Sequence, residues 1–156
     1  TSGDKLIDDV ARKHLKEEIL PLATIITPNV PEAEEIVNFK ILTEDDVNRA
    51  GKFIIDEVGC KSVVIKGGHL TGEAKDYLFL NDGTKKVWTS ERFKTNHTHG
   101  TGCTFSAVIT AELAKGKSII EAVDIGKKFI TAAIKYTPEL GHGNGPVNHI
   151  AFKGDL

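Results

Sequence analysis

A short glycine-containing segment, followed at once by a cysteine, precedes a helical pattern in the second half of the chain. The segment reads His99-Gly100-Thr101-Gly102-Cys103, and the largely apolar run TFSAVITAELA follows it. The first turn of a helix carries backbone N–H groups without partners and a partial positive charge. Glycines let a phosphate approach those groups closely, and a thiol at a helix start is favoured as a thiolate. The segment therefore predicts a phosphate-binding turn, with Cys103 as a general base or as a covalent nucleophile.

Two further segments carry side chains suited to phosphate chemistry. In the sequence NVPE, Glu32 would hold a water or a Mg²⁺ ion that bridges phosphate oxygens. One carboxylate is enough for Mg²⁺, which usually takes only one or two carboxylates plus water. The same four residues also suit a helix start, with Asn29 as the cap and Glu32 as a first-turn acid. Lys66-Gly67-Gly68 would neutralise phosphate charge and make room for a nucleotide, or would form a plain turn with a solvated lysine. The residues alone leave both choices open.

The histidines give weaker signals. His97 and His99 form an HxH pair, but a metal site needs three or four ligands and the neighbouring sequence offers no others. His99 and Cys103 lie four residues apart, a spacing that would suggest a Cys–His hydrolase dyad if both residues lay on one helix. The intervening glycines argue against a shared helical face. The glycines of Gly141-x-Gly143-x-Gly145 follow a helical pattern, whereas a dinucleotide fingerprint follows a strand.

Composition excludes several classes of protein. The 156 residues suffice for one domain, and a formal charge of −2 gives no reason to expect nucleic-acid or anionic-membrane binding. No apolar run approaches the roughly 18 residues that span a bilayer. The two cysteines, Cys60 and Cys103, form no CxxC pair, so neither a disulfide framework nor a thiolate zinc site is expected. A cytoplasmic location is the simplest expectation.

Alternating helical and strand-like patterns predict an α/β layered fold with a mainly parallel sheet. In such a sheet, ligands bind outside the carboxyl ends of the strands, so Asn29, Lys66 and the Gly100 segment would converge on one edge. The expected helices cover residues 4–20, a short stretch from Pro31, a stretch from the Thr43 cap towards Gly59, 101–114, and 118 to about 136; the expected strands cover 23–27 and 62–66, followed by a hairpin around Asn81-Asp82-Gly83.

Four segments carry a family resemblance. The sequences ITPNVPEAEEI, VVIKGGH, THGTGCTFSAVITAELAKG and GHGNGPVNH, in this order and spacing, resemble the hydroxymethylpyrimidine/phosphomethylpyrimidine kinases of thiamine biosynthesis, within the ribokinase-like superfamily. The resemblance implies a three-layer α/β/α fold with a mostly parallel central sheet. It implies MgATP-dependent phosphorylation of 4-amino-5-hydroxymethyl-2-methylpyrimidine and then of its monophosphate, by an enzyme that is a homodimer when full length. Most ribokinase-like enzymes have Asp where this chain has Cys103.

The resemblance also implies roles for individual residues. Gly100, Thr101 and Gly102 would form the anion hole for the transferring phosphoryl group, and Cys103 would be the catalytic base. Glu32 would position Mg²⁺; the nucleotide and its phosphates would lie along Asn29, Lys66, Gly67, Gly68, Gly143, Gly145 and Pro146.

The family's N-terminal part, which holds the pyrimidine, has no counterpart in these residues. We therefore expect residues 1–156 to be the C-terminal, nucleotide-binding portion of a single ribokinase-like domain, with an incomplete substrate pocket and no activity alone. A pyridoxal kinase of the cysteine-containing type is the nearest alternative. A non-catalytic nucleotide-binding module is a third possibility.

Overall fold

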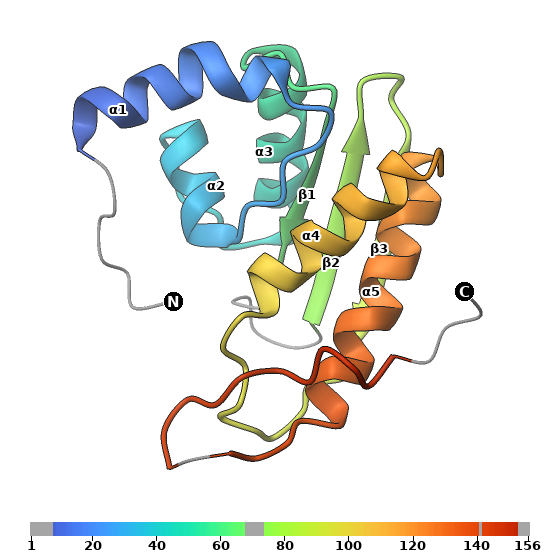
Figure 1. Ribbon diagram of the computed structural model, residues 1–156. Coiled ribbons are helices and arrows are strands. Elements are labelled where there is room, and N and C mark those ends of the chain that lie inside the picture. The colour runs from blue at the N-terminus through green and yellow to red at the C-terminus, as the bar shows by residue number, and fades with distance from the viewer. Residues whose placement is uncertain (1–7, 68–73, 141, 153–156) are drawn as a thin grey trace. The chain divides into compact units, whose positions relative to one another are not determined.

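The computed structural model describes residues 8–67, 74–140 and 142–152 (Figure 1). The chain divides into two units, one ending at Glu91 and the other beginning at Arg92. No helix within the described residues is long and apolar enough to cross a membrane.

A three-stranded antiparallel sheet forms the centre of the first unit. Its strands are β1 (Ser62–Lys66), β2 (Ala74–Leu80) and β3 (Lys85–Ser90), hydrogen-bonded in the order β1-β2-β3. The predicted strand over 62–66 and the predicted hairpin are both confirmed. Gly83 has a φ of 86° in the β2–β3 turn, a left-handed conformation that glycine adopts without strain.

The segment over residues 23–27 does not form the predicted strand. Within this segment, Ile26 makes one isolated parallel bridge to Val63 of β1, and just after the segment Asn29 makes a second one to Lys66. Ile26 is only half-buried, because a few backbone bonds to one neighbour do not enclose a strand on both faces. Within the described part of the first unit, the sheet is therefore antiparallel, and parallel pairing there is limited to these bridges.

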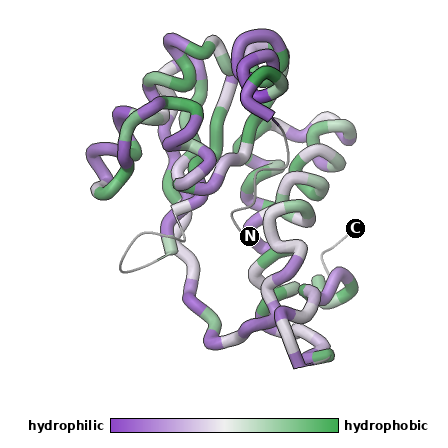
Figure 2. Tube along the Cα trace, turned by 90° about the vertical axis from the view of Figure 1, so that its left-hand side faces the viewer, coloured by the Kyte–Doolittle hydropathy of each residue, from purple (hydrophilic) through white to green (hydrophobic). Residues whose placement is uncertain are grey.

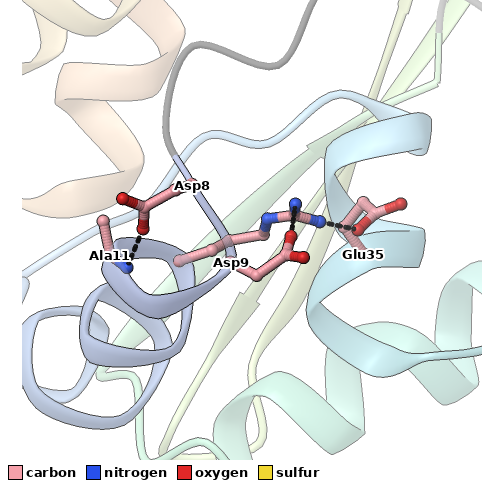
Figure 3. Close-up of polar contacts among 5 residues, drawn as sticks. Asp8, Asp9, Ala11 and Glu35 are labelled. Atoms are coloured by element: carbon pink, nitrogen blue, oxygen red, sulfur yellow. Dashed lines mark hydrogen bonds and ion pairs between the residues drawn. The ribbon is translucent and has the colours of Figure 1, made fainter.

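The first helical segment changes its winding along its length. An ion pair of 2.8 Å between Arg12 and Glu35 joins it to the next helix, and Figure 3 shows this contact beside the Asp8 cap. The helix predicted over 4–20 is confirmed from Asp9 onward; residues 4–7 lie outside the described residues. Its successive parts are α1 (Asp9–His14), the π-helical η1 (Leu15–Ile19) and the 3₁₀-helical η2 (Leu20–Leu22).

Two capped helices, α2 (Val30–Val37) and α3 (Glu44–Asp56), pack against the sheet of the first unit. Asn29 caps α2 and Thr43 caps α3, as predicted. Figure 2 shows hydrophobic and hydrophilic residues interspersed along the helical segments, as amphipathic helices require. The buried cluster under these helices consists of Val30, Ala33, Val37, Ile41, Val47, Ala50, Ile54, Cys60, Val63, Ile65 and Tyr77.

The second unit is built on two helices that pack against each other, α4 (Thr101–Ala114) and α5 (Ile119–Lys135). Their predicted ranges are confirmed to within a residue at each end. Gly126 of α5 faces α4 so closely that a Cβ atom there would lie 3.1 Å from the Phe105 and Ile109 side chains. The absent side chain lets the two helices approach each other along the stretch of α4 that follows its first turn.

Candidate functional site

The start of α4 presents unpaired backbone donors. Gly100 is its N-cap, with a φ of 87° in the left-handed region, so a residue with a side chain would be strained there. The first helical bond runs from the Thr104 N–H to the Gly100 oxygen at 2.8 Å. No described residue accepts a hydrogen bond from the backbone N–H of Gly100, Gly102 or Cys103. Three donors therefore remain for an anion at the positive end of the helix.

Thr101 differs from its neighbours in this turn. Its N–H and its hydroxyl both donate to the carbonyl oxygen of Thr98, at 3.2 Å and 2.6 Å. Both donors are therefore occupied, and Thr101 holds the turn in place instead of adding a free donor.

Cys103 is exposed at the helix start. No hydrogen bond joins it to His99 among the residues that the structure describes, and His99 is itself exposed. The arrangement lacks the paired thiol and imidazole of a Cys–His hydrolase. It leaves the thiol accessible to a substrate oxygen.

A segment near the end of the chain runs beside the residues that precede this turn. His99 donates its N–H to the Gly145 oxygen and accepts from the Val147 N–H, both at 3.1 Å, in a parallel bridge with Pro146. Gly145 is buried, and a Cβ atom there would lie 2.1 Å from Nδ1 of His97. Gly143 is exposed with open space around it. The structure thus brings Gly145 and Pro146 next to the phosphate-binding turn. Close packing against His97 explains why residue 145 is a glycine.

One residue of this region escaped the sequence analysis. His149 lies 3.0 Å through its Nε2 from the hydroxyl of Thr104, which is buried at 8% exposure directly after Cys103. The two residues are 45 positions apart, and neither periodicity nor a local motif indicates such a contact. The single histidine of the GPVNH sequence was the only available signal.

In the first unit, Asn29 and Glu32 form a reciprocal capping box. The Asn29 side chain accepts from the Glu32 N–H at 2.8 Å, and Oε2 of Glu32 accepts from the Asn29 N–H at 2.7 Å. These residues therefore form the helix start that was the alternative to a phosphate site, with Asn29 as the cap and Glu32 in the first turn. The Glu32 side chain is nevertheless exposed, and its Oε1 accepts no hydrogen bond from any described residue. One carboxylate oxygen thus remains for a cation.

Asn29 and Lys66 are neighbours. Their parallel bridge, with the Lys66 N–H donating to the Pro28 oxygen at 2.9 Å, places both at one end of β1. The predicted convergence of these two residues is confirmed. The Gly100 segment belongs to the other unit.

Gly67 has a structural reason of its own. Its N–H donates to the Lys75 oxygen at 2.8 Å, and a Cβ atom would lie 2.3 Å from that oxygen. The backbone at position 67 lies so close to β2 that a glycine is required there, whether or not a nucleotide binds beside it. Gly68 lies outside the described residues.

The donor set fits a magnesium ion better than a metal held by protein alone. No cluster of three or more His, Cys, Asp or Glu residues suited to a metal exists in the described ranges. A single carboxylate with a free hard oxygen, as in Glu32, is what Mg²⁺ uses when phosphates and water supply its other ligands.

Comparison with known proteins gives a consistent result. The family model for phosphomethylpyrimidine kinase matches residues 1–148. The hydroxymethylpyrimidine/phosphomethylpyrimidine kinase of Staphylococcus aureus (strain MSSA476) is 57% identical over 153 residues, 97% of this chain and 55% of the relative. The chain thus spans about half the length of the curated relatives that it matches.

Solved structures agree with the sequence match. The Bacillus subtilis pyridoxal kinase in its ADP complex superposes with a TM-score of 0.85 at 43% identity, covering 94% of this chain and 57% of that one. The phosphomethylpyrimidine kinase of Clostridium difficile 630 gives a TM-score of 0.73 at 46% identity, covering 86% of this chain and 53% of that one.

These neighbours have the ribokinase-like fold, so the predicted fold class is confirmed, with this chain holding part of it. The assignment of residues 1–156 to the C-terminal portion of that domain stays a prediction. The four motifs, the family match over residues 1–148 and the superposition on two solved kinases agree, and the chain belongs to the phosphomethylpyrimidine kinase family.

Proposed function

We propose that this chain carries the phosphoryl-transfer and nucleotide-binding part of an ATP-dependent kinase that phosphorylates 4-amino-5-hydroxymethyl-2-methylpyrimidine and then its monophosphate. The observation that supports it most is the start of α4, where Gly100, Gly102 and Cys103 offer unpaired N–H groups beside an exposed thiol. In phosphoryl transfer the protein mainly positions groups and stabilises charge. The family supplies the substrate class, which the described residues do not specify.

Each residue has a defined part in the proposed reaction. Gly100 and Gly102 donate backbone hydrogen bonds to the phosphoryl oxygens as negative charge develops on them, and Thr101 holds the turn that carries them. Cys103 would accept the proton of the substrate hydroxyl. The hydroxyl oxygen forms a bond to the γ-phosphorus of ATP while the bond from that phosphorus to the bridging oxygen breaks and ADP leaves. Glu32 would hold Mg²⁺ through its free Oε1, and Asn29 and Lys66 would contact phosphates. When bound, ATP supplies the phosphoryl group that is transferred, and Mg²⁺ neutralises negative charge on the phosphates.

The rest of the nucleotide site is proposed on the same basis. Gly67 and Gly68 would lie along the nucleotide, and Gly143, Gly145 and Pro146 near its adenine. The titles of solved relatives name ADP and AMP-PCP complexes, which supports ATP as the donor. A homodimer and a cytoplasmic location are part of the proposal.

Removal of the thiol tests the role of Cys103. Cys103→Ala keeps the backbone donor but removes the base, so we expect kcat to fall about 10²- to 10⁴-fold while ATP affinity is kept. Ser106→Ala is the control, because Ser106 lies one turn along α4 and its hydroxyl bonds only to carbonyls of that turn. The assay follows ADP formation. It uses the native polypeptide, by which we mean the whole natural polypeptide that contains these 156 residues. Equal kcat values for the two variants would exclude Cys103 as the base.

Pyridoxal kinase is the second candidate, because the solved Bacillus subtilis relative at 43% identity is a pyridoxal kinase. The same assay with hydroxymethylpyrimidine, its monophosphate and pyridoxal as acceptors separates the two. A higher kcat/KM for pyridoxal would replace the first proposal with the second. MgATP binding without turnover of any acceptor would favour a non-catalytic nucleotide-binding module.

A further inference from the structure

The segment 145–149, which we call the strap, holds the phosphate-binding turn from both sides. Before the turn, the strap is bonded to His99 through the Gly145 oxygen and the Val147 N–H, each at 3.1 Å. After the turn, His149 of the strap reaches the Thr104 hydroxyl at 3.0 Å. The four residues from Gly100 to Cys103 are therefore bracketed by contacts to a single segment of five residues.

The strap is itself fixed to α5. The Asn148 N–H donates to the Ala133 oxygen at 2.9 Å, and the Asn148 side-chain amide donates to the Tyr136 oxygen at 2.8 Å. Gly145 lies against His97 with no room for a side chain. The strap thus connects the turn to a rigid helix, and His149 is the only described strap side chain with a hydrogen bond to α4.

Thr104 is well placed to pass this restraint to the turn. Its N–H makes the first helical bond, to the Gly100 oxygen, and its hydroxyl lies 3.9 Å from where a Cβ atom of Gly100 would stand. A threonine hydroxyl inside a helix commonly bonds back to the carbonyl four residues earlier, which here would be Gly100. The imidazole engages the hydroxyl instead, so the rotamer of Thr104 is held by a residue outside the helix.

We infer that His149 is a positioning residue for phosphoryl transfer: through Thr104, it holds the Gly100–Cys103 turn in the conformation that receives the phosphoryl group. This inference rests on the proposed function. Because a misplacement of about 1 Å in a catalytic arrangement costs about 100-fold in rate, His149→Ala lowers kcat about 10- to 100-fold. The KM for ATP stays within about 2-fold, since the turn meets the phosphoryl group most strongly in the transition state.

Four companion variants make the test specific. His149→Gln places an amide nitrogen near the Nε2 position and restores most of the kcat. Thr104→Val removes the hydroxyl at constant shape and lowers kcat as much as His149→Ala does, and the double variant is no worse than either single one, because both act through one bond. His14→Ala is the control, since His14 is an exposed histidine of α1 bonded to Glu18; it leaves kcat unchanged.

The experiment measures kcat and KM for ATP in the native polypeptide, with circular dichroism melts to confirm that each variant is folded. A folded His149→Ala variant with unchanged kcat, or a double variant that shows the product of the two single losses, overturns the positioning role while the proposed function stands. If the unmodified polypeptide phosphorylates neither the pyrimidines nor pyridoxal, the proposed function fails and the positioning role fails with it.

Discussion

Replacement of Glu32 by glutamine separates two uses of the same carboxylate. In the structure, Oε2 of Glu32 completes the capping box with the Asn29 N–H at 2.7 Å, while Oε1 is the oxygen proposed for Mg²⁺. A glutamine side chain still offers an amide oxygen to the Asn29 N–H, but it carries no charge and is a poor Mg²⁺ ligand. Glu121→Gln is the matched control, because Glu121 closes the same kind of box with Ser118 at the start of α5.

The expected stability change is small. Glu32→Gln loses only the interaction of a negative charge with the helix N-terminus, about 0.3–1 kcal/mol. For a chain of this length that corresponds to a decrease in Tm of about 1–4 °C. Glu121→Gln should lower Tm to a similar small extent, since it removes the same charge from an equivalent position. Asn29→Ala removes the cap itself and should cost about 1 kcal/mol.

The effect on catalysis should differ sharply between the two glutamine variants. Loss of a group that orients a metal typically lowers metal affinity about 10- to 100-fold, so Glu32→Gln should raise the Mg²⁺ concentration for half-maximal activity by that factor. Glu121→Gln should leave it unchanged. The assay titrates MgCl₂ at fixed ATP and follows ADP formation by the native polypeptide. Identical Mg²⁺ titrations for the two variants would show that Glu32 is a helix cap and nothing more.

Three further changes have defined outcomes. Gly102→Val should abolish measurable ATP turnover, because a branched side chain blocks phosphate from the backbone donors; unchanged kinetics would contradict the anion hole. Gly67→Ala should lower the free energy of unfolding by about 1–3 kcal/mol in urea titrations, since its Cβ would lie 2.3 Å from the Lys75 oxygen. The Ile41 N–H and the Lys40 ammonium hold the pKa of Glu34 below its ordinary value of 4.5. That stabilisation is complete above pH 4.5 and is lost as the pH falls through the lower, folded-state pKa. Glu34→Gln should therefore be less stable than wild type at pH 7 and nearly equal to it at about pH 2; a difference that persists in acid would contradict this reasoning.

Local features of the fold were predictable from the sequence. The caps at Asn29 and Thr43, the β2–β3 hairpin and the range of α4 all depend on residues within a few positions of one another. Capping side chains, turn glycines and apolar periodicity determine such features with little help from the rest of the chain.

Features that depend on pairing between distant segments were not predictable in the same way. An apolar run such as residues 23–27 has the same composition whether it becomes a full strand or makes only an isolated bridge. The sequence of β1 likewise contains no signal that distinguishes antiparallel from parallel pairing with its neighbour β2. The contact between His149 and Thr104 depends on tertiary placement of two polar side chains. Gly67 suggested nucleotide contact, but the backbone of β2 already requires a glycine there.

Within these 156 residues, the contrast between the two cysteines favours site-selective labelling at one of them. Cys60 is buried, and burial raises the pKa of its thiol, whereas Cys103 is exposed. Because the thiolate is the form that reacts, a maleimide fluorophore would attach at the start of α4 and leave Cys60 unmodified. Occupancy of the adjacent turn by an anion could then be read optically, as a change in the dye's emission.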